Sequence, residues 1–348
     1  MWWKTLINSF EISQSTKKAY AIQIERLIEE TGQPLEYILR HPQETINTLD
    51  SLNTSIVTKR SRISSLCGLL KHWDEGKKKY TTEHQQWCSF QRDLNRSISE
   101  KALDGEASER EIINWVPWHK VLAREKELSK TQYGSNEHLL LAMYTHIEPM
   151  RADFGNVKLY FSDPPDCTRT REGNFVYCSK DPQKSYICLN QYKTMKKYGR
   201  FHRKLPDSLV QIIHANLVIQ PREYLFAFDG EPYTKKNSFG KYANRIFNNL
   251  FQKRMTISLM RHSFISAIDF NMTKAKDLIQ VSRNMQHSLG MQQYYRRHVP
   301  EVAVDLREQS QPEPVRATHS HSHHHVVRNE PRPKKKKKQI HGERSFYI

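Results

Sequence analysis

The sequence predicts a mainly α fold with a small antiparallel β-sheet, an α+β architecture. Apolar residues recur at helical spacing through the first hundred residues and again over 238–283, whereas the stretch between them holds short runs rich in Val, Ile, Tyr and Phe. The length of 348 residues is enough for two hydrophobic cores. We therefore expect a helical domain over 1–105, a second domain over 106–308 that carries the sheet, and a disordered tail over 309–348, where Gln, Pro, Ser, His and Lys dominate.

The first domain is expected to begin with two amphipathic helices. Ser15 and Thr16 can cap a helix that Gly32 ends, and Thr54 or Ser55 can cap another. The apolar faces consist of Tyr20, Ile24, Leu27 and Ile28, and of Ile56, Ile63, Leu66, Leu70 and Trp73. Exposed cations accompany them at Lys17, Lys18, Lys59, Arg60 and Arg62. Such a charged face is either simply solvated or contacts phosphates, and the sequence leaves both interpretations open.

The second domain is expected to change its periodicity along the chain. Polar residues over about 75–110 predict the domain boundary, and apolar stretches follow over 112–122 and 139–147. Four short runs between turn residues predict the strands of the antiparallel sheet, over 156–160, 174–178, 185–189 and 200–205. Helical spacing returns over 238–250, 258–270 and 275–283.

Composition narrows the class of partner. With 55 Lys and Arg against 37 Asp and Glu, the net charge of +18 indicates a polyanion, and nucleic acid is the first candidate. No apolar run is long enough to span a membrane, so no membrane partner is expected. The five cysteines form no Cys-x-x-Cys pair, which predicts neither a disulfide framework nor a zinc site and favours an intracellular protein. The run of five lysines from Lys334 to Lys338 predicts nuclear import or nonspecific DNA binding, whereas the histidines over 319–325 are not expected to form a metal site.

Four separated segments hold the residue types that can cut a phosphodiester without a metal. They are PMRADF with Arg151, YKTMKKYG with Lys193, SLMRHSF with Arg261, and MQHSLGMQQYY with His287, Tyr294 and Tyr295. Each segment alone is ordinary, because single surface charges and packed tyrosines are common. Their order and setting together resemble the catalytic domain of tyrosine recombinases, the family of phage integrases and Xer-type enzymes. The resemblance covers about residues 11–300, where the helical first domain is similar to the core-binding domain of that family, and it is most specific between Arg261 and Tyr295.

The resemblance implies a metal-independent and ATP-independent DNA strand transferase that needs no cofactor. Arg151 and Arg261 would hold the scissile phosphate, since a guanidinium can donate to two oxygens at once. Lys193 would protonate the leaving 5′ oxygen, His287 would bind the phosphate or assist proton movement, and Tyr295 would attack to form a 3′-phosphotyrosine. The spacing Gln-x-Tyr favours Tyr295 as nucleophile, with Tyr294 as the alternative.

One departure from the family pattern concerns the first position of its His-x-x-Arg motif. Ser258 stands there, three residues before Arg261, and a hydroxyl cannot hold a proton near neutral pH as an imidazole can. Two alternatives therefore stay open: a type IB topoisomerase-like relaxing enzyme, and a catalytically inactive DNA-binding relative. The resemblance also implies double-stranded DNA as partner, a homotetramer on two duplexes, and a source in a large eukaryotic DNA virus or mobile element. The segment over 299–306 is a candidate for packing on a neighbouring protomer.

Overall fold

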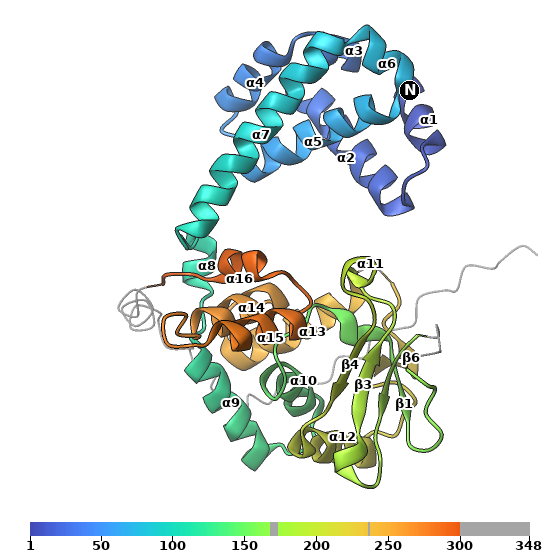
Figure 1. Cartoon of the computed structure of the whole chain (residues 1–348), viewed down its shortest axis with the longest axis vertical. Coiled ribbons are helices and arrows are strands. Elements are labelled where there is room, and N and C mark those ends of the chain that lie inside the picture. Colours follow the sequence, from blue (N-terminus) through green and yellow to red (C-terminus); the bar gives the residue numbers. More distant parts are fainter. Residues whose placement is uncertain (168–172, 236, 300–348) are drawn as a thin grey trace, which may run out of the picture. The chain divides into compact units, whose positions relative to one another are not determined.

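The computed structural model describes residues 1–167, 173–235 and 237–299, and its secondary structure can be followed in Figure 1. The first seven helices are α1 (Trp2–Ser9), α2 (Gln14–Thr31), α3 (Leu35–Arg40), α4 (Pro42–Ser51), α5 (Ile56–His72), α6 (Asp74–Lys79) and α7 (Thr81–Leu103). The helices that follow are α8 (Glu109–Ile113), α9 (Trp118–Thr131), α10 (Asn136–Thr145), α11 (Met195–Tyr198), α12 (Asp207–Ile219), α13 (Ser238–Phe251), α14 (Ile257–Ser266), α15 (Ala275–Asn284) and α16 (Leu289–Tyr295). The strands are β1 (Val157–Tyr160), β2 (Asn174–Tyr177), β3 (Tyr186–Leu189), β4 (Phe201–Lys204), β5 (Ala227–Phe228) and β6 (Glu231–Pro232), with short 3-10 turns at Asp153–Asn156 and Pro182–Lys184. The predicted mainly α fold with a small sheet is confirmed.

Local sequence signals set the ends of the first helices. Ser13, two residues before the expected Ser15, caps α2 by accepting from the Thr16 amide, and Gly32 ends this helix in the left-handed conformation at φ 66°. Ser55 caps α5, as one of the two predicted candidates. The apolar faces of α2 and α5 meet α7 in one hydrophobic cluster that includes the fully buried Trp87.

The polar stretch that predicted a boundary is mostly helical. The helix α7 runs for 23 residues, and its burial is concentrated at Trp87 while most other positions stay at least partly exposed. It ends just before Gly105, whose φ of 69° favours glycine. The described residues up to Val299 belong to one compact unit, which holds a second large hydrophobic cluster with members between Trp115 and Met260. The division into domains at residue 105 stays a prediction.

The four-stranded sheet has the order β1-β2-β3-β4 and differs in one pairing from the sequence expectation. The pairs β2–β3 and β3–β4 are antiparallel, but β1 and β2 run parallel, with Val157 opposite Asn174. The expectation of a purely antiparallel sheet was therefore wrong. Parallel neighbours need a long connection that returns the chain to its starting edge, and the stretch over 161–173 is long enough to do so.

The cysteine expectation also needs a correction. Cys167 and Cys188 form a disulfide with their Cα atoms 6.1 Å apart, which joins the segment after β1 to β3. These two cysteines lie 21 residues apart in the sequence, and in the fold both pack in one small cluster with Phe175 of β2, which lies opposite Cys188 of β3. Cys67, Cys88 and Cys178 are free.

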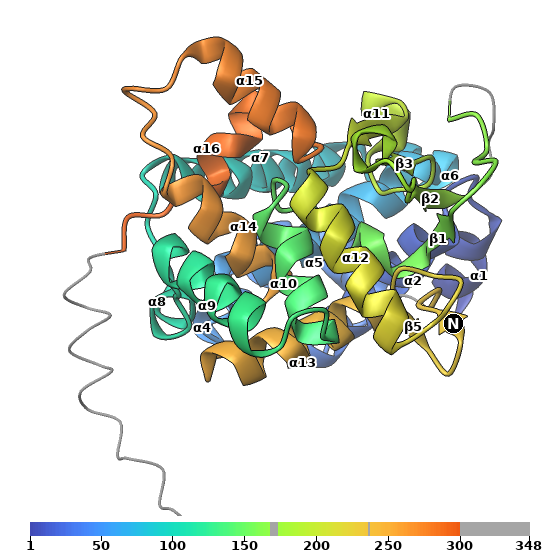
Figure 2. The same cartoon turned by 90° about the horizontal axis from the view of Figure 1, so that it is seen from below.

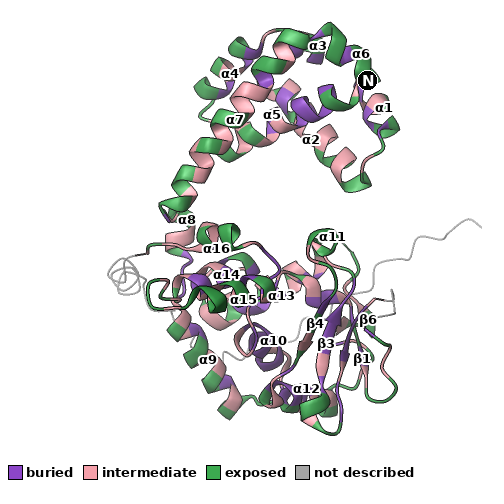
Figure 3. Ribbon diagram, viewed as in Figure 1, coloured by how far each residue is buried: buried purple, intermediate pink, exposed green. Residues whose placement is uncertain are grey.

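The helix α10 forms the centre of the second hydrophobic cluster. Every residue from His138 to Tyr144 is buried, and α10 is mostly purple in Figure 3. It contacts α9, α12 and α13, so its carboxyl end, which leads to Arg151, has a fixed position in the core. No helix in the described part of the chain is both long and apolar enough to cross a lipid bilayer.

Candidate active site

Arg261 is the most deeply buried charged residue of the site. It lies inside α14, which Thr256 caps by accepting from the Leu259 amide, and only 1% of its surface is exposed. Its Nη1 donates to the Pro149 carbonyl at 2.8 Å, and both terminal nitrogens lie 3.3–3.4 Å from the Met285 carbonyl oxygen. These contacts fix the guanidinium. Its Nε is buried and has no hydrogen-bond partner among the described residues.

Arg151 and the β3–β4 connection converge on one carbonyl group. Arg151 follows α10, and its Nη1 donates to the Gln286 carbonyl oxygen at 3.0 Å. The Thr194 hydroxyl donates to the same oxygen at 3.2 Å. Gln286 adopts the left-handed conformation at φ 59°, which costs free energy in a residue with a side chain and is frequent at functional sites. A strained turn between α15 and α16 thus gathers three distant segments.

Lys193 lies near this cluster, next to Thr194, and its charge acts on the carboxyl group of Asp153. It is exposed beside Thr194, while Asp153 is largely buried and its Oδ2 has no hydrogen-bond partner among the described residues. Burial raises the pKa of Asp153, and the positive charges of Arg151, Arg261 and Lys193 oppose this rise. The charges of three cations that were predicted from separate motifs therefore act on one carboxyl group.

His287 presents an unprotonated nitrogen to the site. Its Nδ1 donates to the Ser288 carbonyl oxygen at 3.0 Å, whereas its Nε2 is buried without a hydrogen-bond partner in the described chain. Burial is the main cause that lowers the pKa of His287 to about 4, and the nearby Arg261 and Arg151 add to the effect. The ring is therefore neutral at pH 7, with the proton on Nδ1 and a free electron pair on Nε2.

The ring of Tyr295 lies among these groups. Its centroid is 4.7 Å from the Arg261 guanidinium carbon, 5.3 Å from the His287 ring and 5.0 Å from the His262 ring. Among the described residues these three contacts belong to Tyr295 and not to Tyr294. Arg261 and His262 come from α14, Tyr295 from α16 and His287 from the turn between α15 and α16, and these helices can be seen from a second direction in Figure 2. The structure thus brings Arg151, Arg261, His287 and Tyr295 together, with Lys193 near them.

Ser258 is the predicted residue with the weakest connection to the site. It is exposed one turn before Arg261, and its hydroxyl has no hydrogen-bond partner within the described part of the chain. Its catalytic role stays a prediction. His262 and Gln286 were not predicted from the sequence. The signal for His262 was its place directly after Arg261, whereas nothing in the residue type of Gln286 indicates a positive φ.

The five predicted DNA-binding residues of the helical domain have different environments. Lys18 and Arg60 are exposed, and Arg60 donates to the Asn95 side chain at 2.8 Å. Lys17 donates to the Asn8 carbonyl at 2.6 Å, and Lys59 pairs with Asp50. Arg62 differs from them, because it is only 3% exposed and binds both carboxylate oxygens of Glu30. This burial argues against a phosphate contact by Arg62 and assigns it a structural ion pair.

Several sequence expectations lie outside the described residues. These are the tail over 309–348 with Lys334 to Lys338, the histidines over 319–325, and most of the segment over 299–306. Within the described ranges, no group of three or more His, Cys, Asp or Glu side chains could hold a metal ion.

Comparisons with known proteins give little further information. No family model matches the chain, and no curated protein matches it. Among solved structures the chain is similar to a crystal structure of XerA recombinase, with a TM-score of 0.37 and 13% sequence identity over 90% of this chain and 97% of that chain. A likeness at this level carries no argument about function.

Proposed function

We propose that this chain is a site-specific DNA recombinase of the tyrosine recombinase kind. It would cleave and rejoin DNA through a covalent 3′-phosphotyrosine intermediate, with Tyr295 as nucleophile. One observation carries the proposal: the Tyr295 ring contacts a buried arginine and a buried neutral histidine that come from two distant sequence motifs. A packed tyrosine needs neither group, because burying charged and polar atoms without partners costs free energy.

One orphaned donor of the site suits a phosphate group. Arg261 Nε is buried without a partner among the described residues, and Arg151 is half-buried beside it, whereas the bare His287 Nε2 can only accept a proton. Negative charge collects on the nonbridging oxygens of a phosphodiester as it approaches its pentavalent transition state. Two guanidinium groups would stabilise this charge in a setting with little water, where electrostatic interactions are stronger.

The proton transfers can be assigned to groups of the chain. The phenol oxygen of Tyr295 would attack phosphorus while the bond from phosphorus to the 5′ oxygen breaks. His287 Nε2, which carries no proton, would accept the phenolic proton, and Lys193 would donate a proton to the leaving 5′ oxygen. The reverse sequence would rejoin the strands, because the phosphotyrosine ester keeps the energy of the broken linkage.

Double-stranded DNA is the proposed partner. The net charge of +18 and the exposed Lys18 and Arg60 support binding to the phosphate backbone, which should weaken steeply as salt rises. A homotetramer on two duplexes follows from the resemblance alone. Nuclear import through Lys334 to Lys338, or association with a virus or mobile element, is a proposal of the same kind.

A nicked suicide duplex tests the function. Cleavage next to the nick releases a short oligonucleotide, so the covalent adduct accumulates and can be seen as a band of reduced mobility in a denaturing gel. We expect an adduct from the unaltered chain and from Tyr294→Phe, and none from Tyr295→Phe. Absence of any adduct over a library of duplex sequences would favour the inactive DNA-binding alternative, and rapid relaxation of supercoiled plasmids of random sequence would favour the topoisomerase-like one.

A further inference from the structure

The nucleophile stands at the end of a short helix. The helix α16 spans only Leu289–Tyr295, and Ser288 caps its start by accepting from the Met291 amide. The last carbonyl groups of any α-helix have no partner within the helix, and short helices are unstable by themselves. The direction of the Tyr295 ring therefore depends on what holds the carboxyl end of α16.

Two side chains hold this end by donating hydrogen bonds to its carbonyl groups. Arg297 Nη1 donates to the Tyr294 oxygen at 2.7 Å and to the Arg296 oxygen at 2.9 Å. His262 Nδ1 donates to the Tyr295 oxygen at 2.8 Å. Three successive carbonyl groups around the nucleophile thus receive hydrogen bonds from side chains, and the backbone amide of Arg297 is bound by Ser266 at 2.8 Å.

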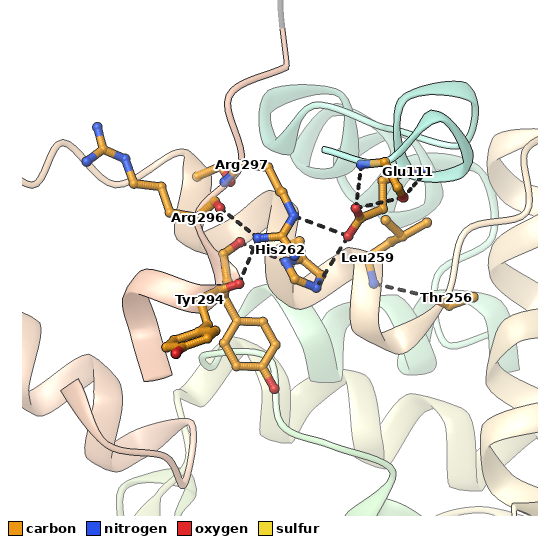
Figure 4. A network of polar contacts seen from close by, with 10 residues as sticks. Glu111, Thr256, Leu259, His262, Tyr294, Arg296 and Arg297 are labelled. Carbon is orange, nitrogen blue, oxygen red and sulfur yellow. Dashed lines mark hydrogen bonds and ion pairs between the residues drawn. The ribbon is translucent and has the colours of Figure 1, made fainter. Parts of the chain in front are cut away.

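Glu111 binds Arg297 and lies beside the ring of His262, as Figure 4 shows. Its Oε1 accepts from Arg297 Nε at 3.2 Å and lies 3.8 Å from His262 Nε2. Its Oε2 accepts from the backbone and the hydroxyl of Ser108 at 2.9 Å, in the capping box at the start of α8. Burial raises the pKa of Glu111, but the bonds from Ser108 and the charge of Arg297 outweigh it and lower the pKa overall, so the carboxylate is charged at pH 7.

We propose that Glu111, His262 and Arg297 form a clasp that positions Tyr295 for attack. The three residues do not touch the scissile phosphate in this account and act through the backbone of α16, so they are positioning residues. The inference rests on the proposed function, because it deepens the role of the same nucleophile. The chain next to the clasp takes part as well, since the His298 amide donates to the Gly105 carbonyl at 2.8 Å.

The clasp gives α8 a direct connection to the chemistry. Glu111 comes from the segment that follows α7, and 186 residues separate it in the sequence from Arg297. A displacement of the reacting oxygen by a fraction of an ångström lowers the rate of a positioned reaction strongly. Loss of the clasp should therefore slow strand cleavage while leaving the DNA-binding surface intact.

The experiment compares Glu111→Gln with Glu109→Gln in the full chain. Glu109 is the matched control, because it is exposed on the same helix and makes no contact with the clasp among the described residues. The rate of adduct formation is measured at saturating suicide duplex, together with the Kd for DNA. Amide hydrogen exchange is measured on a peptide that contains α16 in the DNA-free chain. We expect Glu111→Gln to slow adduct formation about tenfold to a hundredfold, with Kd unchanged within about twofold, and to speed exchange in α16. Glu109→Gln should change neither.

A conservative pair at His262 separates positioning from general damage. The amide nitrogen of asparagine can replace Nδ1 as donor to the Tyr295 carbonyl, whereas phenylalanine cannot. His262→Asn should therefore keep most of the cleavage rate that His262→Phe loses. Equal rates for Glu111→Gln and Glu109→Gln, with equal exchange in α16, would overturn the clasp while the proposed function stands. If the unaltered chain forms no adduct, the proposed function fails, and the exchange measurement still decides whether the clasp exists.

Discussion

The buried histidine of the site should make the fold sensitive to mild acid. His287 is 2% exposed, and burial with the neighbouring arginines lowers its pKa from 6.5 to about 4. The folded chain therefore holds His287 neutral at pH 5, whereas the unfolded chain binds a proton there. Because the unfolded state binds more protons between these two pKa values, stability falls as the pH drops through this window.

The size of the effect follows from the two pKa values. A shift of one unit corresponds to about 1.4 kcal/mol, and lowering the pH from 7 to 5 covers most of the interval between the unfolded and the folded value. His287 should thus contribute a loss of about 2 kcal/mol in the free energy of unfolding over this range. The loss in the free energy of unfolding reaches its full size only below the folded pKa of about 4, where His287 is protonated in both the folded and the unfolded state.

Urea unfolding of the unaltered chain and of His287→Asn at pH 7 and pH 5 measures this contribution. Asparagine can retain the donor to the Ser288 carbonyl but does not titrate. We expect the variant to lose about 2 kcal/mol less than the unaltered chain between the two pH values. His119→Asn, at an exposed histidine, is the control and should follow the unaltered chain. Equal pH dependence in His287→Asn and the unaltered chain would refute the assignment of a buried neutral imidazole.

Three further predictions separate residues that act in cleavage or DNA binding from residues that stabilise the fold. Lys193→Ala should form adduct at least about a hundredfold more slowly than the unaltered chain on an ordinary suicide duplex. On a duplex with sulfur in place of the 5′ bridging oxygen it should react at nearly the original rate, because a thiolate leaves without a general acid. Equal slowing on both substrates in a gel-based rate measurement would contradict the role of Lys193. Arg62→Ala should lower the free energy of unfolding by about 2 kcal/mol and leave DNA affinity unchanged, because it breaks a buried pair with Glu30. Its counterpart Lys18→Ala should reduce DNA affinity and spare stability in the same fluorescence anisotropy and urea assays; the opposite pattern would reverse these assignments.

The sequence was informative wherever a local signal determines structure. Gly32 and Ser55 mark helix ends because their conformational and hydrogen-bonding properties act within a few residues, and the structure places both as expected. The four strands were found for the same reason. Their pairing was not, because the parallel β1–β2 neighbours depend on the path of a long connection, which local propensity does not encode.

In the candidate site, too, the sequence predicted what local motifs determine and missed what depends on distant contacts. Arg151, Arg261, His287 and Tyr295 could be named from their motifs, since each motif gives a residue type in a recognisable setting. Arg62 could not be separated from the surface cations, because its burial depends on Glu30 in another helix. The clasp was equally hidden, since Glu111 and Arg297 meet only after folding, and a capping box at Ser108 gives no sign of a distant partner.

The central claim is that Tyr295 attacks a DNA phosphate among groups supplied by Arg151, Arg261, Lys193 and His287. Peptide mapping of the trapped covalent complex tests it most directly: the adduct is digested with a protease and a nuclease, and fragmentation in the mass spectrometer locates the attached nucleotide. The account predicts a nucleotide 3′-phosphate on Tyr295. A nucleotide on Tyr294, on another residue, or attached through a 5′-phosphate would contradict it.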